Sequence, residues 1–300
     1  MRRELHEGLL APRAALSPKF FYDRLGSRLF EAITELDEYY PTRTEAAIFE
    51  RHAADMAQAI GRLGTLADLG AGNCAKAMRL LPVLQPAAYV AVDISVEFLR
   101  DALQTVQRRH PALDVTGVGM DFSEAFELPD GVLQGRSVFF YPGSSIGNFT
   151  PEEALAFLVR LRRHATGGGL LIGVDLVKPA AELEQAYDDA LGVTAAFNLN
   201  LLRHANRLIG ADFSAREWRH HACWNEAQSR VEMHLQARHA LTVRWDGGQR
   251  LFGAGESIHT ENSCKYTTGS FSALLADAGY RDIQAWTDEQ QRFAIFWAHA

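Results

Sequence analysis

The chain has 300 residues, of which 47% are hydrophobic and 22% are charged, and its formal net charge is −7. This composition is typical of a globular protein with one large or two modest domains, and it excludes global disorder. The diffuse acidic balance, without a dense Lys/Arg run, argues against nucleic acid as a partner. No apolar run approaches the roughly 18 residues that a membrane helix needs, so no membrane partner is expected.

The first half of the chain alternates helices and strands after an aromatic-rich segment over residues 1–43. A helix is predicted at residues 44–60, where apolar side chains recur on one face. Nearly continuous apolar strands then alternate with helices, which predicts a parallel sheet covered on both faces. The predicted strands are 65–69, 88–93, 114–119, 137–141 and 169–175, and the predicted helices are 75–84, 96–110 and 151–165.

The pattern changes after Lys178 and indicates an α+β region. Here the predicted helices are 180–191 and 194–209, and the predicted strands are 230–237, 241–245 and 257–265. A helix at 271–279 and strands at 281–287 and 293–298 follow, and we expect this closing pair to complete the first sheet. The predicted division is therefore one domain of residues 44–178 plus 266–300 and a second of residues 1–43 plus 179–265.

The segment LADLGAGNCAKAM joins a predicted strand to a predicted helix. Gly70 and Gly72 would let the backbone turn tightly and approach a ligand, and the start of a helix offers free N–H groups. Asp93 ends the next strand, where a carboxylate accepts hydrogen bonds from a ribose diol. The loop therefore predicts a nucleoside-containing cofactor.

Two cofactor classes fit this loop. The spacing of the two glycines and Ala75 satisfies the loose dinucleotide pattern, and it also fits the loop of class I methyltransferases. Asp68 would be a buried carboxylate that needs a partner, and methyltransferases typically have an acidic residue there. Asp121 and Phe122, after the third strand, would suit the amino group and ring face of adenine. These residues favour S-adenosylmethionine, and an NAD-dependent oxidoreductase or a non-catalytic nucleotide-binding module stays the alternative.

The cysteines and histidines predict no metal site. Cys74, Cys223 and Cys264 are odd in number and far apart, so they form neither a disulfide framework nor a paired zinc spacing. The adjacent His220 and His221 would point to opposite faces of a strand, and no fourth ligand is suitably spaced. Because the start of the chain also lacks the apolar core of a signal peptide, a cytoplasmic protein is expected.

Longer strings resemble one known family, the histidine-specific, S-adenosylmethionine-dependent methyltransferases of ergothioneine biosynthesis. The resemblance runs from about residue 10 to residue 300. It implies a class I methyltransferase (Rossmann-like) α/β domain with a second, α+β substrate-binding domain. It also implies trimethylation of the α-amine of L-histidine to hercynine, with no obligatory protein partner. The strings are FFYDRLGSRLFEAITELDEYYPTRTE (20–45), YPGSSIGNFTPEE (141–153), DLVK (175–178), AYDDALGVTAAFN (186–198), RVEMHLQAR (230–238) and HTENSCKY (259–266).

The resemblance also implies roles for individual residues. Asn148 and Tyr187 resemble the residues that hold the carboxylate end of the amino acid. Glu261 and Ser263 resemble those that contact the imidazole, with Tyr39 beside them. The cofactor contacts implied in the same way are Gly70, Lys76, Asp93, Asp121 and Phe122.

Catalysis is expected to rest on positioning. The methyl group of a sulfonium is already activated, so the enzyme must mainly align a neutral amine with it. By resemblance, the carbonyl of Gly143 and the side chain of Tyr22 would orient the N–H bonds of the amine. Aromatic faces suit a growing quaternary cation, and Phe197 and Tyr39 are candidates. Met233 is a candidate lining residue, although a methionine in a strand is more often core.

Two departures from the family leave the substrate open. Tyr141 and Pro142 precede Gly143 where family members have Phe-Leu, and Asn262 separates the two residues assigned to the imidazole. The alternatives are tryptophan, or a thiolated histidine methylated at a ring nitrogen. Glu261 argues against tryptophan, because an indole offers one N–H and much apolar surface.

Overall fold

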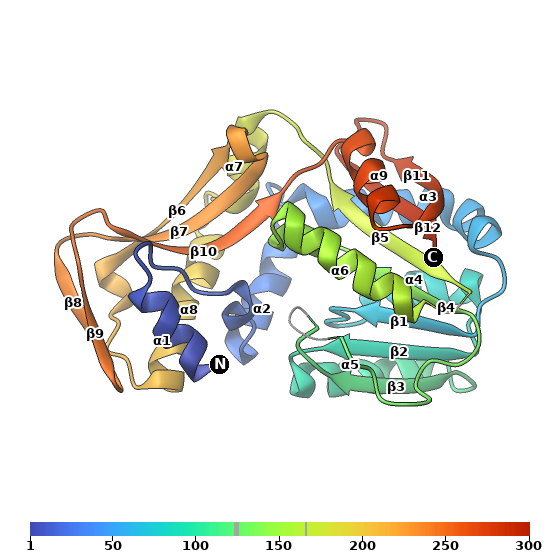
Figure 1. Cartoon of the computed structure of the whole chain (residues 1–300), viewed down its shortest axis with the longest axis horizontal. Coiled ribbons are helices and arrows are strands. Elements are labelled where there is room, and N and C mark those ends of the chain that lie inside the picture. Colours follow the sequence, from blue (N-terminus) through green and yellow to red (C-terminus); the bar gives the residue numbers. More distant parts are fainter. Residues whose placement is uncertain (123–125, 166) are drawn as a thin grey trace. The chain divides into compact units, whose positions relative to one another are not determined.

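The computed structural model describes residues 1–122, 126–165 and 167–300, and the chain forms two compact units (Figure 1). Unit 1 consists of Met1–Tyr40 and Lys178–Ser263, and unit 2 consists of Pro41–Val177 and Cys264–Ala300. The sequence prediction had placed the three divisions after residues 43, 178 and 265. Both units are therefore built from two separate segments of the chain.

Unit 2 contains a seven-stranded sheet in the order β11-β12-β5-β4-β1-β2-β3. The pairs β4–β1, β1–β2, β2–β3 and β4–β5 are parallel, whereas β12 is antiparallel to both of its neighbours. The predicted parallel sheet is confirmed, and the closing pair of strands joins it as expected. The strands are β1 (Thr65–Leu69), β2 (Ala88–Asp93), β3 (Asp114–Gly119), β4 (Ser137–Tyr141), β5 (Gly169–Asp175), β11 (Arg281–Thr287) and β12 (Phe293–His299).

Helices cover both faces of this sheet. Along β4, Val138 and Phe140 pack into one apolar core while Phe139 and Tyr141 pack into the other. This explains why the central strands are apolar at nearly every position. No described helix is both long and apolar enough to cross a membrane. The helices on one face are α3 (Tyr40–Ile60), α4 (Ala75–Leu84) and α5 (Val96–Arg109), and those on the other are α6 (Pro151–His164) and α9 (Thr268–Asp277).

Unit 1 has its own core, formed by a small sheet, a hairpin and helices. The three-stranded sheet has the order β10-β7-β6, and β8 and β9 form an antiparallel hairpin. In β7, Val231, Met233 and Leu235 are buried in this core, and the residues between them are half-buried. The elements are α1 (Arg2–Leu10), η1 (Pro18–Phe21), α2 (Arg24–Thr34), α7 (Ala180–Tyr187), α8 (Val193–Ile209), β6 (Trp218–Asn225), β7 (Arg230–Ala237), β8 (Leu241–Trp245), β9 (Gly248–Phe252) and β10 (Ser257–Cys264).

Some predicted element boundaries were wrong. The helix predicted at 180–191 ends at Tyr187. The carboxylate of Asp189 instead accepts hydrogen bonds from the backbone N–H groups of Val193 (2.9 Å) and Thr194 (2.7 Å), at the start of the next helix. The helix predicted from residue 44 begins at Tyr40, since a proline is well tolerated in a first turn. The sequence analysis did not predict α1, α2, β6 or β9.

Candidate active site

The predicted cofactor loop lies at the carboxyl end of β1 in unit 2. Gly70 and Gly72 have φ values of +69° and +53°, which favour glycine. The N–H of Gly70 donates to the carbonyl of Val92 (2.8 Å), and the N–H of Gly72 donates to the carboxylate of Asp93 (2.9 Å). A Cβ at Gly72 would meet nothing closer than 4.0 Å. The loop backbone is therefore held in place and leaves room for a ligand.

Asp93, Asp121 and Phe122 lie at the same edge of the sheet. The other oxygen of the Asp93 carboxylate accepts from the N–H of Ser95 (2.8 Å) and so ties the loop to the start of α5. Both carboxylate oxygens keep further lone pairs for a ligand. The N–H of Met120, just before Asp121, donates to the carbonyl of Asp93 (3.1 Å). The ring of Phe122 comes within 3.8 Å of the place that a Cβ on Gly70 would take. The structure thus brings the predicted cofactor residues together.

Asp68 is a buried carboxylate next to this loop. Burial raises its pKa to about 7, against the opposing effects of a hydrogen bond from the Tyr89 hydroxyl and of the Lys76 charge. The Tyr89 oxygen lies 2.6 Å from one carboxylate oxygen, and the other oxygen has no hydrogen-bond partner among the described residues. A buried carboxylate of this kind fits a ligand that carries positive charge, as S-adenosylmethionine does.

A second buried carboxylate, Glu45 of α3, was missed by the sequence analysis. One of its oxygens accepts from the N–H of Gly143 (2.7 Å), and the other lies 2.6 Å from the Lys76 ammonium nitrogen. Gly143 has a φ of +77°, and a Cβ there would be 2.6 Å from that nitrogen. Glycine at 143 is therefore what allows Lys76 to reach Glu45. No local motif could have revealed a contact between residues 98 positions apart.

Asn148 ends the short 3-10 helix η2 (Ser145–Asn148), which follows β4. The residue is half-buried. Within the described parts of the chain, its side-chain amide makes no hydrogen bond. An amide held in this state can donate to and accept from a ligand.

In unit 1, the structure brings several predicted substrate residues together. The hydroxyl oxygens of Tyr187 (α7) and Ser263 (β10) are 2.6 Å apart, and both side chains are buried. The ring of Tyr39 meets that of Tyr187 edge-on, with centroids 6.4 Å apart. Glu261, two residues before Ser263 on β10, is only 9% exposed. Met233 is 2% exposed and packs in the core, which agrees with the more common role of such a methionine.

An aromatic cluster adjoins Tyr39. Tyr22 meets both Phe30 and Phe197 edge-on, with ring centroids 5.8 Å apart in each case. Phe30 in turn meets Tyr39, with centroids 6.2 Å apart. Three members of this cluster were predicted to contact the substrate, and Phe30 was not. Its only signal in the sequence is its place in the aromatic-rich segment before residue 44.

His220 and His221 point to opposite faces of β6, as expected for adjacent strand residues. The ring nitrogens of His220 lie 2.7 Å from the Tyr187 carbonyl oxygen and 2.8 Å from the Asn198 amide nitrogen. The ring of His221 instead lies beside that of His234, with centroids 6.3 Å apart. These two histidines therefore do not form a common site.

The sheet of unit 2 and the residues at the ends of its strands define the class of protein. The sheet is parallel except for one antiparallel strand, and it has a glycine loop after the first strand and an acid at the end of the second. This is the arrangement of class I S-adenosylmethionine-dependent methyltransferases. The family described as "Histidine-specific methyltransferase, SAM-dependent" matches residues 1–300, and the chain belongs to this family. The cofactor is therefore S-adenosylmethionine and not NAD, and the chain is an N-methyltransferase.

Relatives with a stated activity are similar along nearly the whole chain. A histidine N-α-methyltransferase of Mycobacterium tuberculosis is 40% identical over 311 residues, which cover 98% of this chain and 93% of the relative. The protein of the same name from Mycolicibacterium smegmatis is 40% identical over 302 residues, with the same coverage. A solved structure of a Pyrococcus horikoshii protein covers 93% of this chain and 99% of its own, with 13% identity and a TM-score of 0.51, and it supports the fold alone.

Proposed function

We propose that this enzyme methylates the α-amine of L-histidine in successive steps to give trimethylated histidine, hercynine, as in ergothioneine biosynthesis. The main support is a group of polar side chains buried in unit 1. Tyr187, Glu261 and Ser263 are each at most 9% exposed, and buried polar groups of this kind reject ligands that cannot hydrogen-bond to them. The two relatives named histidine N-α-methyltransferase support the same substrate.

The methyl donor is assigned to residues of unit 2. The open backbone at Gly70 and Gly72 would accommodate its methionine part, and Asp93 would accept hydrogen bonds from its ribose diol. Asp121 and Phe122 would contact the amino group and ring face of adenine. When bound, the donor supplies an electrophilic methyl group. Lys76, fixed by Glu45, completes this set.

The amino acid is assigned to the side chains of Tyr39, Asn148, Tyr187, Glu261 and Ser263. Glu261 would accept a hydrogen bond from an imidazole N–H, and Ser263 would contact the same ring, with Tyr39 beside it. Ser263 is already held by Tyr187 (2.6 Å), which fixes the direction of its hydroxyl group. Asn148 and Tyr187 would bind the carboxylate end. The side-chain amide of Asn148 makes no hydrogen bond to the described residues, so it is available to bind this carboxylate.

Catalysis would consist of presenting a neutral amine in line with the methyl group. The carbonyl of Gly143 and the hydroxyl of Tyr22 would accept hydrogen bonds from the amine and orient its lone pair, and the proton would pass to solvent without a dedicated strong base. The Glu45 hydrogen bond to the N–H of Gly143 holds the backbone directly before that carbonyl. Later methylation steps produce a quaternary cation, which the faces of Tyr22, Phe30, Phe197 and Tyr39 would stabilise.

Mass spectrometry of the products tests the reaction, the substrate and the number of methyl groups together. The protein is incubated with S-adenosylmethionine and each of the twenty amino acids, and with a thiolated histidine. We expect a trimethylated product from histidine alone. A product from tryptophan or from the thiolated histidine, with none from histidine, would show that histidine is not the substrate. A product that stops at one methyl group would contradict the successive reaction.

The variant Asn148→Ala tests the carboxylate-binding assignment. Loss of a hydrogen bond to a charged group costs about 1.5–3 kcal/mol, so kcat/KM for histidine is expected to fall roughly 10- to 100-fold. Affinity for S-adenosylhomocysteine, measured by calorimetry, should stay unchanged. The control is Gln290→Ala, which removes an exposed amide from unit 2. An unchanged kcat/KM in Asn148→Ala would show that Asn148 does not bind the substrate.

A further inference from the structure

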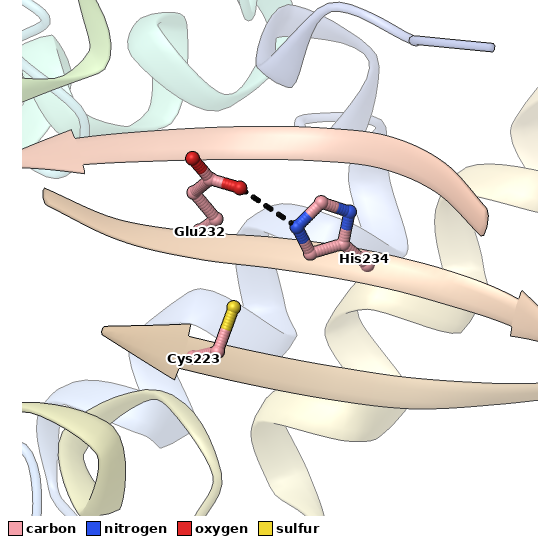
Figure 2. Close-up of side chains that lie close together, drawn as sticks. All are labelled: Cys223, Glu232 and His234. Carbon is pink, nitrogen blue, oxygen red and sulfur yellow. Dashed lines mark hydrogen bonds and ion pairs between the residues drawn. The ribbon is translucent and has the colours of Figure 1, made fainter. Parts of the chain in front are cut away.

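One face of the β10-β7-β6 sheet carries side chains that commonly bind metal ions. Because Val231, Met233 and Leu235 point into the unit 1 core, Glu232 and His234 project from the opposite face of β7. Cys223 of β6 is paired directly with Glu232 in the antiparallel register, and paired residues project from the same face. Figure 2 shows Cys223, Glu232 and His234 gathered on this face.

The three side chains are close enough to share one ion. A ligand atom from each, the Cys223 sulfur, a Glu232 oxygen and a His234 ring nitrogen, lies within 4.8 Å of the other two. The closest pair is His234 Nε2 and Glu232 Oε2, at 3.0 Å. In a tetrahedral zinc site with bonds of about 2.0–2.3 Å, ligand atoms lie roughly 3.3–3.8 Å apart. Small rotations of these side chains would reach that geometry.

Neighbouring residues fix the carboxylate and leave one of its oxygens directed at His234. Glu232 Oε1 accepts hydrogen bonds from Arg230 Nε (2.8 Å) and Asn225 Nδ2 (2.9 Å). Burial alone would raise the pKa of Glu232, but the hydrogen bonds from Arg230 and Asn225 outweigh it and lower that pKa to about 2. The carboxylate is therefore ionised and oriented, as metal ligands are by the groups behind them.

Imidazoles surround the same place. The ring of His234 lies between those of His259 on β10 and His221 on β6, with centroid distances of 5.2 Å and 6.3 Å. Cys223, Glu232 and His234 are each half-buried, so an ion from solvent could reach them while remaining partly shielded from water.

We propose that Cys223, Glu232 and His234 form a site for a thiophilic divalent cation of the Zn(II) type. A thiolate, an imidazole and a carboxylate suit this class of ion, whereas Mg²⁺ and Ca²⁺ prefer oxygen ligands alone. On binding, the thiol proton of Cys223 is released to solvent, and the proton that His234 Nε2 shares with Glu232 leaves for solvent while Nδ1 takes one up, so that the ring stays neutral and Nε2 binds the metal. Water occupies the fourth position. The ion then links β6 to β7 on the face opposite Met233.

This site departs from the sequence expectation of no metal. That expectation weighed His220, His221 and Cys223, which are neighbours in the chain. The site instead combines one residue of β6 with two of β7, and the combination depends on the register Cys223–Glu232 of the hairpin. The site does not depend on the proposed histidine methylation.

Cobalt(II) provides the spectroscopic test. Protein treated with a chelator and dialysed is titrated with Co(II), and we expect one equivalent to produce a thiolate-to-cobalt charge-transfer band that Zn(II) then abolishes. Cys223→Ser should lose the band and weaken Zn(II) binding at least 10-fold. The matched control is Glu256→Gln, because Glu256 is another unit 1 glutamate paired with an arginine (Arg250, 2.8 Å). Binding by this variant should be unchanged.

Alkylation of the wild-type protein tests the same proposal without a variant, and so remains informative if Cys223→Ser fails to fold. Saturating Zn(II) should slow the reaction of Cys223 with iodoacetamide at least 10-fold, as read by peptide mapping. The buried Cys74 and Cys264 serve as internal references, and zinc should leave their rates unchanged. A cobalt complex without a thiolate band, or a Cys223 alkylation rate that zinc leaves unchanged, would overturn the proposal. Neither readout measures methylation, so failure here is separate from failure of the proposed function.

Discussion

Single buried carboxylates organise much of unit 2. Glu45 is 1% exposed, yet its two oxygens bind the backbone of Gly143 and the ammonium group of Lys76, which come from two other parts of the fold. Removing one partner of a buried pair leaves the other uncompensated. We therefore regard Glu45 as a positioning residue, which holds the backbone N–H of Gly143 and so restrains the position of the carbonyl that follows in the same residue.

A pair of substitutions separates this role from simple stability. In Glu45→Ala, the N–H of Gly143 loses its acceptor, and kcat for methylation is expected to fall roughly 10- to 100-fold, the equivalent of about 1.5–3 kcal/mol. Glu45→Gln should recover most of this loss, because its amide oxygen can accept the same hydrogen bond. Glu50→Ala is the control, since Glu50 lies exposed on the same helix. Equal losses of kcat in both Glu45 variants would contradict positioning through Gly143.

Asp68 makes stability depend on pH. Its pKa is about 7 in the folded chain, where burial raises it, and 3.8 without the fold. The folded state thus binds the proton more tightly, so the contribution is fully present below pH 4 and is lost as pH rises through 7. The difference between these two pKa values corresponds to a change of at most about 4 kcal/mol in the free energy of unfolding.

Asp68→Asn removes this loss, while its amide oxygen can still accept from Tyr89. The variant should therefore unfold at a higher temperature than the wild type at pH 8, and the difference should shrink at pH 5. Thermal unfolding monitored by circular dichroism at the two pH values measures this change. Asp114→Asn, at an exposed residue at the start of β3, is the control. A difference that is the same at both pH values would show that Asp68 does not titrate as described.

At the scale of elements, β5 shows why a glycine stands inside a buried strand. A Cβ at Gly173 would lie 2.1 Å from the Glu45 carboxylate and 3.0 Å from the ring of Phe293. The absence of a side chain thus allows α3 to place Glu45 directly against the strand. Glycine inside a strand commonly marks such a close approach.

Gly173→Ala should displace Glu45 and disturb Gly143 in turn. We expect a destabilisation of about 1–3 kcal/mol from overpacking, together with a fall in kcat. Gly269→Ala, near the start of α9, is the control, because its nearest neighbouring atom is 3.9 Å away. That variant should be neutral or slightly more stable, since alanine favours helix. Thermal unfolding and steady-state kinetics measure both effects, and a Gly173→Ala enzyme with the wild-type kcat would argue against the close contact.

The elements also show what the sequence allowed us to predict. The strands β1, β2, β4 and β5 were predicted to the residue, because burial on both faces leaves long apolar runs. The strand β6 was missed, since WRHHACWN lacks a clear alternation and only its pairing with β7 defines it. The glycine loop could be recognised because its residues are neighbours in the sequence. The contacts of Glu45 and the group around Cys223 could not, because they join segments that are distant in the sequence.

At the scale of the whole molecule, the chain passes from one unit to the other three times, after Tyr40, Val177 and Ser263. Each unit has its own core, and the predicted ligand-binding residues are divided between them. In unit 1, Leu5 and Leu9 of α1 pack in the same core as Val231 of β7. The two segments of that unit therefore depend on each other for burial.

Hydrogen exchange should resolve the two sets of ligand contacts. S-adenosylhomocysteine is expected to slow exchange in unit 2 at residues 70–76 and 120–122. Histidine added to that complex should slow exchange further at residues 187–188 and 259–263 of unit 1. The hairpin of β8 and β9 serves as an internal reference that neither ligand should affect. If histidine changed the exchange of unit 2 alone, the substrate residues assigned to unit 1 would be wrong.

The position of β12 has a consequence for synthesis on the ribosome. The strand β5 pairs with β4 on one side and with β12 on the other. Its second edge must therefore wait for a partner while residues 176–292 are translated, which takes roughly 6–23 s at about 5–20 residues per second. During that interval, a strand that is apolar up to its last residue, Asp175, presents unpaired backbone groups, which is the kind of edge that promotes aggregation. The nascent chain is thus exposed to misassembly late in translation, when a chaperone bound near β5 would protect it most.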